Sequence, residues 1–187
     1  MVCVLILSLF ATTLLFFRVD TVHQATFTVS LQSPRPNDPV SVFHQAQGFY
    51  LAGNRCLLDI EVGPGVTQCL VSPGVVNLCL SIELFLKALI IARGAAAPKS
   101  HKLVDLVAAV ESSHIDAVRS QYAQVITTPA FDELLSEIND FFVKIRYGYE
   151  FDIFAFQEAP VSVLAKSLYL NSAMVHGIKV GIQAMRV

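Results

Sequence analysis

Two charged residues interrupt the most apolar stretch of the chain. Residues 73–94 are apolar almost throughout, yet they include Glu83 and Lys87, four positions apart. In an α-helix this spacing places both side chains on one face. Burying charges without partners costs free energy, so the fold must supply groups that neutralise them. The pattern therefore predicts a polar centre inside a helical protein.

A second pair with the same spacing, Arg146 and Glu150, follows later in the chain. If the two helices face each other, Glu83 can meet Arg146. Lys87 can then meet Glu150, which satisfies all four charges. Two interpretations stay open. In the first, the charges are structural, either as a closed network or as an ion pair at the rim of a helix. In the second, they form the floor of a pocket that binds a phosphate or a base through Arg146 and Lys87.

Three more side chains suit the same chemistry. His101 follows Ser100 at a predicted helix start, where it either stabilises the turn or acts as a general base. Tyr147 and Tyr149 either stack on a nucleobase or pack at the end of the bundle. The ligand-binding candidates are Glu83, Lys87, Arg146, Tyr147 and Glu150. The weaker catalytic candidates are Arg146 and His101.

Other kinds of site find no support in the sequence. There is no Ser-His-Asp order and no glycine loop of the type that binds phosphates, and the glycines at 63 and 65 flank a turn proline. The four cysteines form no CxxC pair and have no histidine at a zinc-finger spacing, which favours free thiols. We therefore expect neither a metal nor a cofactor.

The overall charge argues against indiscriminate binding to nucleic acids. The net charge is −2 and no long block of Lys or Arg occurs, so strong non-specific binding to duplexes is not expected. A local basic groove is compatible with the sequence and would use Lys87, Lys99, Lys102, Lys144 and Arg146. The chain is 54% hydrophobic and 15% charged, against roughly 25% charged in typical soluble domains. This composition favours self-association.

Hydrophobic spacing predicts an all-α, up-and-down bundle. Asp38 and Pro39 are typical of a helix start, and Gly94 is typical of a helix end. Ser100 is a candidate N-cap. The predicted helices cover residues 40–60, 74–93, 101–111, 113–126, about 129–145, and 158–185. The last helix carries an apolar seam that continues through Ile182 and Met185.

The beginning of the chain is predicted to lie outside this bundle. Residues 1–17 contain no charge, which fits a signal or anchor, a start-site artefact, or a packed apolar element. Residues 25–32 alternate apolar and polar side chains, as strands do. A linker rich in proline follows at residues 33–39. We therefore divide the chain into an N-terminal segment, 1–37, and a helical domain, 38–187.

Taken together, these motifs resemble the HEPN (higher eukaryotes and prokaryotes nucleotide-binding) domain. The resemblance rests on Asn77-Leu-Cys-Leu-Ser-Ile-Glu-Leu-Phe-Leu-Lys-Ala-Leu-Ile-Ile91, Gly94, Ser100-His-Lys-Leu-Val-Asp-Leu106 and Phe141-Phe-Val-Lys-Ile-Arg-Tyr-Gly-Tyr-Glu150. It covers residues 38–185. It implies a bundle of four or five helices that usually dimerises. It also implies one of several roles: a ribonuclease of toxin–antitoxin or defence systems, a partner of a nucleotidyltransferase, or a nucleotide-binding module.

The ribonuclease members of that family carry an Arg, four to six residues and then a His near the start of a late helix. In this chain Arg146 has no His in that window, and His176 has no Arg correctly placed before it. Arg18 and His23 have the spacing but lie in the N-terminal segment. The chain thus departs from the family's ribonuclease pattern, and whether it is an enzyme stays open.

The resemblance therefore implies a nucleotide- or RNA-associated module of a toxin–antitoxin or defence system. The implied partners are a second copy of the chain, a nucleotidyltransferase or antitoxin, and RNA or a nucleotide. The alternative is a non-catalytic dimerisation or partner-binding module whose charge network is structural. The expected location is the cytoplasm, and the alternative is a membrane anchored through residues 1–17.

Overall fold

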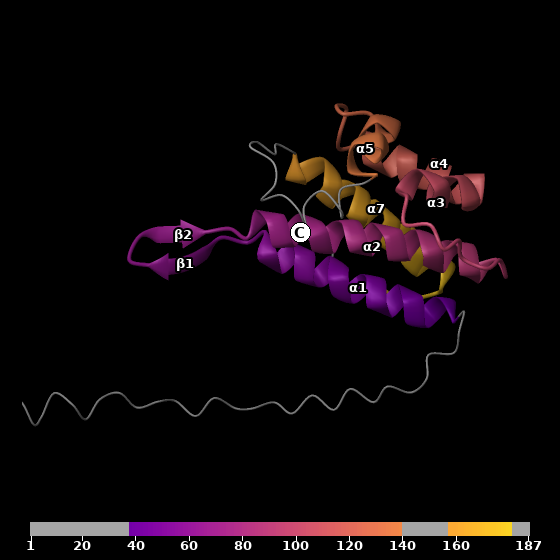
Figure 1. Cartoon of the computed structure of the whole chain (residues 1–187), viewed down its shortest axis with the longest axis horizontal. Helices are drawn as coiled ribbons and strands as arrows, with labels where there is room; N and C mark the ends of the chain where they lie inside the picture. Colours follow the sequence, from indigo (N-terminus) through magenta and orange to yellow (C-terminus); the bar gives the residue numbers. More distant parts are fainter. Residues whose placement is uncertain (1–37, 140–156, 181–187) are drawn as a thin grey trace, which may run out of the picture. The chain divides into compact units, whose positions relative to one another are not determined.

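The computed structural model describes residues 38–139 and 157–180, all of which belong to the compact unit Pro34–Val187. Three long helices, α1 (Pro39–Cys56), α2 (Val71–Ala92) and α7 (Glu158–Val175), pack against one another (Figure 1). The shorter helices are α3 (Leu103–Ala109), α4 (Ser112–Ala123) and α5 (Phe131–Ile138). Of these, α3 packs on α2 and α4 packs on α7. The predicted all-α bundle is confirmed.

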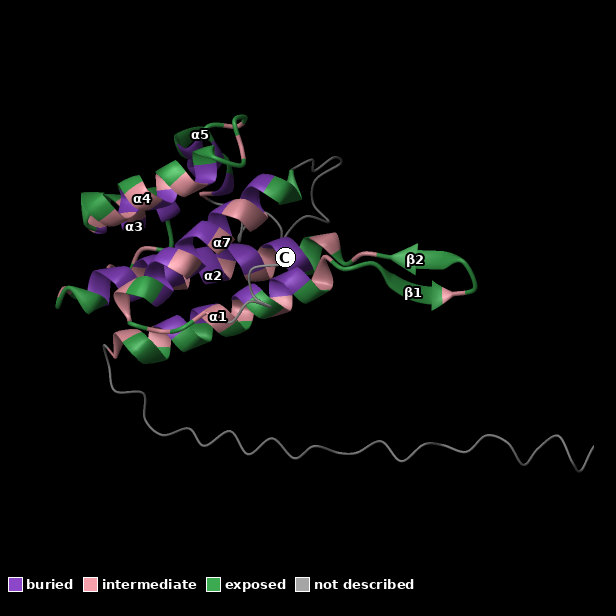
Figure 2. Cartoon of the chain, turned by 180° about the vertical axis from the view of Figure 1, so that it is seen from behind, coloured by how far each residue is buried: buried purple, intermediate pink, exposed green. Residues whose placement is uncertain are grey.

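The first two helices are joined by a β-hairpin that the sequence analysis did not predict. α1 begins as expected, because the Asp38 carboxylate accepts a hydrogen bond from the Val40 N–H. It ends at Cys56, four residues before the predicted end, and the chain continues into β1 (Ile60–Gly63) and β2 (Val66–Gln68). The strands pair antiparallel, with Gly65 at a positive φ of 70° in the turn. The hairpin projects beyond the helices and is almost entirely exposed (Figure 2).

The last described helix is much shorter than predicted. α7 ends at Val175, ten residues before the predicted end at 185. Gly177 has a φ of 64°, and its N–H donates to the Met174 carbonyl. The next N–H, that of Ile178, donates to the Ala173 carbonyl, which completes a standard helix stop. The prediction failed because the apolar spacing continues past this glycine; the later seam residues lie outside the described residues.

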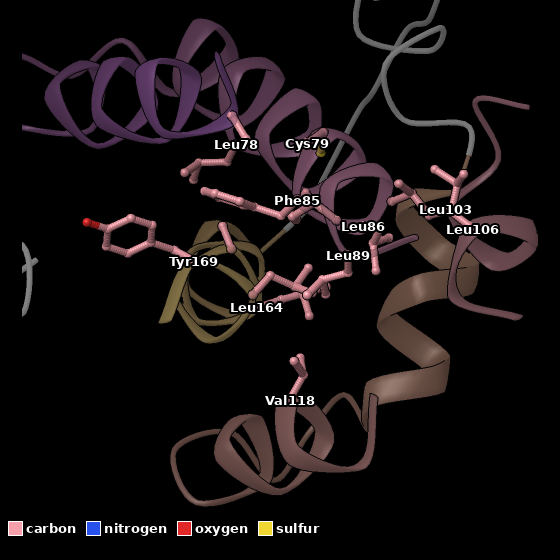
Figure 3. Packing of buried hydrophobic residues seen from close by; sticks show 14 of the residues in the cluster. Leu78, Cys79, Phe85, Leu86, Leu89, Leu103, Leu106, Val118, Leu164 and Tyr169 are labelled. Carbon is pink, nitrogen blue, oxygen red and sulfur yellow. The ribbon is translucent and has the colours of Figure 1, made fainter. Parts of the chain in front are cut away.

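The core lies where α1, α2 and α7 meet. Phe85 of α2 is fully buried, and its ring centroid is 5.6 Å from that of Phe43 and 5.8 Å from that of Tyr169. Figure 3 shows Phe85 and Tyr169 close together beside Leu78 and Leu86. By length and composition α2 could cross a membrane, with a mean hydropathy of 2.1 over its most apolar window. Its packing against α1, α3 and α7 accounts for that apolar character.

Two glycines allow α1 and α2 to approach closely. A Cβ added at Gly53 would lie 2.9 Å from Leu78 Cγ and 3.0 Å from the Gly74 carbonyl oxygen. A Cβ at Gly74 would lie 2.8 Å from a methyl carbon of Leu57. Any side chain at either position would force these helices apart. Glycine has a low helix propensity, so Gly53 weakens the prediction of a helix from sequence. The close packing of α1 against α2 explains why a glycine occurs there.

Candidate functional site

A buried ion pair lies midway along α2. Lys87 Nζ donates to Glu83 Oε1 at 2.7 Å, and the two side chains are 16% and 11% exposed. The pair is possible because the two residues are one helical turn apart on the same face. The prediction that Glu83 points inward is confirmed, since the whole residue is 8% exposed. The arrangement places an ionic centre inside an otherwise apolar helix.

A histidine from the loop after α2 completes the cluster. His101 Nδ1 lies 2.9 Å from the same carboxylate oxygen, Glu83 Oε1, while its side chain is 78% exposed. A carboxylate only accepts hydrogen bonds, so Nδ1 must carry the proton. In the neutral ring the lone pair therefore lies on Nε2. We call Lys87, Glu83 and His101 the Lys–Glu–His cluster.

The loop that carries His101 is fixed by its own hydrogen bonds. Ser100 Oγ accepts from the Lys102 N–H at 3.1 Å and donates to the Asp105 carboxylate at 2.8 Å. The Val104 N–H in the first turn of α3 donates to Asn139 Oδ1, which follows α5. α3 starts at Leu103, two residues later than predicted, with Lys102 at the N-cap position. The prediction of Ser100 as N-cap was therefore wrong, because it stabilises the turn that precedes the cap.

Three exposed cations flank His101 on this loop. Arg93, Lys99 and Lys102 are all exposed, and no acidic residue occurs from position 93 to position 102. Together with His101 they give this stretch of a chain with net charge −2 a local excess of basic residues, beside which lies the Asp105 carboxylate, 2.8 Å from Ser100 Oγ. An excess of this kind attracts phosphate groups without making the whole protein basic. We call residues 93–102 the basic loop.

The other predicted site residues are not placed. Arg146, Tyr147 and Glu150, with Lys144 and Tyr149, lie outside the described residues. The four-charge network between helices therefore stays a prediction, as do the ligand contacts of these side chains. The contact between Glu83 and His101 was missed, although both residues were candidates. The turn between them returns the chain toward α2, and only that path brings the two residues together.

Two other titratable groups near the core have pKa values shifted by burial. Burial raises the pKa of the Cys79 thiol to about 12, which leaves it protonated and unreactive. Burial also lowers the pKa of His176, an effect that Asp38 opposes and His44 reinforces. Among residues 38–139 and 157–180, no group of three or more His, Cys, Asp or Glu side chains could hold a metal ion.

A separate groove lies between α1, α4 and α7. It has a volume of about 710 Å³, which is within the range of small-molecule sites. It is lined by residues of α7 and by residues at and just after the C-terminal ends of α1 and α4. Leu58, after α1, and Val125, after α4, are among them and are 59% and 66% exposed. The groove was not foreseen, because three segments distant in sequence create it.

Comparison with known proteins gives one match. A family model described as the HEPN domain matches residues 75–168, which is half of the 187-residue chain. The matched region contains the whole Lys–Glu–His cluster and the basic loop. No curated protein and no solved structure matches the chain.

Proposed function

The chain belongs to the HEPN domain family, and we propose that it uses the basic loop to bind the phosphates of RNA or of a nucleotide. At family level it is a nucleotide- or RNA-associated module. The observation that carries the finer proposal is the presence of the exposed Arg93, Lys99 and Lys102 in a stretch, residues 93–102, that contains no Asp or Glu. We extend it to a toxin–antitoxin or defence setting, with a nucleotidyltransferase or antitoxin as partner.

The Lys–Glu–His cluster supports this proposal by holding the loop in place. Glu83 is in the core helix, and its bond to His101 ties the loop to a rigid element. A rigid loop presents its cations in a fixed arrangement, which lowers the entropy lost on binding. The cations themselves remain on the surface, where a polymer can reach them.

Binding of a single-stranded RNA should show a salt dependence set by these three cations. Three phosphate contacts predict a slope of about −2 for log K against log salt concentration. Lys102→Gln is expected to reduce that slope by about 0.7. The matched control is Arg55→Gln, which removes an exposed cation from the last turn of α1 and should leave the slope unchanged. Fluorescence anisotropy of labelled RNA across a salt series measures the slope for the wild type and for each variant.

A second set of measurements separates RNA from a free nucleotide. A nucleoside triphosphate that binds the folded chain raises its melting temperature in proportion to the logarithm of ligand concentration. Binding of the triphosphate without RNA would restrict the proposal to nucleotides. The proposal of phosphate binding by the basic loop would be contradicted if neither RNA nor the triphosphate binds. It would also be contradicted if Arg55→Gln reduces the salt slope as much as Lys102→Gln does.

A second candidate function, a dimerisation module, is favoured by the groove. Its exposed Leu58 and Val125 are apolar residues that a partner would cover. We propose that two copies pack reciprocally, with the α4 end of each copy in the groove of the other. Such an exchange is compatible with two-fold symmetry.

This dimer makes a direct prediction. The wild type should elute as a dimer in size-exclusion chromatography with light scattering, and Val125→Lys should shift it to monomer by placing a charge in the interface. Val104→Lys is the matched control, since Val104 is 46% exposed and does not line the groove. A monomeric wild type, or a dimer that tolerates Val125→Lys, would rule this interface out.

A further inference from the structure

His101 combines two properties that seldom occur together. Its ring is largely exposed, yet one ring nitrogen is held 2.9 Å from a buried carboxylate. Because Nδ1 carries the proton, Nε2 has the free lone pair and is the nucleophilic atom. A histidine held in this way by a carboxylate has a fixed tautomer and a fixed ring orientation.

We propose that His101 is a phosphoacceptor that takes a phosphoryl group on Nε2 from an amidophosphate or acyl phosphate donor. The Nε2 lone pair attacks phosphorus and forms an N–P bond. The donor's bond from phosphorus to its leaving group breaks, and the leaving group keeps that electron pair. The proton on Nδ1 stays in place, so the imidazole ring gains positive charge as the bond forms.

The surroundings of His101 stabilise both charges of the product. The Glu83 carboxylate, 2.9 Å from Nδ1, stabilises the positive charge that develops on the ring. The phosphoryl oxygens are negative, and the segment that carries His101 also carries the exposed cations Arg93, Lys99 and Lys102. Lys87 donates to the same carboxylate oxygen, Glu83 Oε1, at 2.7 Å and so helps to hold the carboxylate in place.

The geometry beside His101 suits a reactant that approaches from outside the fold. A general base needs its reactant held within hydrogen-bond reach, whereas a phosphoacceptor needs only that its donor reach the ring. The cavity beside His101, lined by Cys79, Leu80 and Leu103 among others, has a volume of only about 10 Å³. A phosphoacceptor needs no such cavity, because its donor approaches from solvent or from another protein. The high exposure of the ring meets that requirement.

The test is phosphorylation of the full chain by phosphoramidate, followed by intact mass and peptide mapping. His44 is the internal control, because it is also exposed but its Nδ1 faces the amide oxygen of Gln47 at 3.4 Å. We expect acid-labile phosphorylation that is about tenfold faster at His101 than at His44. His101→Gln should abolish the faster reaction and leave the slower one at His44. Glu83→Gln should slow the reaction at His101 about tenfold and leave His44 unchanged.

Equal rates at His101 and His44 would overturn the proposal. A Glu83→Gln variant that is phosphorylated at the wild-type rate would also overturn it. If that variant does not fold, the ratio of the phosphorylation rates of His101 and His44 in the wild type decides. Parallel reactions with acetyl phosphate and with ATP distinguish the sources of the phosphoryl group, and transfer from ATP alone would contradict the donor class. The assay contains no RNA, so its failure leaves the proposed phosphate binding untouched.

Discussion

Glu83→Ala is expected to lower the free energy of unfolding by about 3 kcal/mol. The variant leaves the Lys87 ammonium group, only 16% exposed, without the carboxylate that lies 2.7 Å away. A buried charge that loses its partner keeps its desolvation cost and loses its Coulomb energy. The same change releases His101 and the basic loop from α2. Urea denaturation at neutral pH measures the loss.

Two control variants separate this effect from simple loss of a side chain. Replacing both members of the pair, Glu83→Leu with Lys87→Leu, should restore most of the stability because no charge stays buried. Asp116→Ala removes one of the two exposed carboxylates that pair with Arg119 and should cost less than about 1 kcal/mol. A Glu83→Ala variant as stable as the Asp116 variant would mean that the cluster is not a buried ionic centre.

The polar centre was predictable because its signal is local. Two charges at helical spacing in an apolar run can share one face only if the run is a helix, and burial then follows from the surrounding residues. The predicted helix at 113–126 follows the same logic: its counterpart α4 buries Ile115, Val118 and Tyr122, which are three and four positions apart.

Features that depend on the chain path were not predictable. The strands of the hairpin after α1 are only four and three residues long, too short for their alternation to mark them as strands. The bond between Glu83 and His101 spans 18 positions and depends on the turn that Ser100 stabilises. The end of α7 depends on one residue, Gly177, within a continuing apolar pattern. In each case tertiary geometry decides what local periodicity leaves open.

The two faces of α2 link stability to the site. Phe85 and Glu83 are two positions apart, so their side chains point in clearly different directions around the helix. Phe85 packs against aromatic residues of α1 and α7, whereas Glu83 contacts the loop before α3. The aromatic packing therefore positions the helix, and the helix positions the cluster. Variants on the two faces should affect stability alike but binding differently.

Phe85→Ala is expected to lower the free energy of unfolding by about 3–5 kcal/mol. The side chain is fully buried, and its removal leaves a cavity among Phe43, Tyr50 and Tyr169, whose rings lie 5.6–6.4 Å from it. A well-packed core relaxes only partly around such a cavity, so both the transfer energy and the packing energy are lost. Urea denaturation and thermal unfolding measure the change.

Met174→Ala is the matched control, because Met174 is a large apolar residue of α7 that is 67% exposed; it should change stability by less than about 0.5 kcal/mol. Below its melting temperature, Phe85→Ala should keep the wild-type salt slope for RNA binding, since the basic loop is intact. A stability loss below about 1 kcal/mol would show that the core collapses around the missing ring. The aromatic packing would then not be what fixes α2 between α1 and α7, and the cluster would need another support.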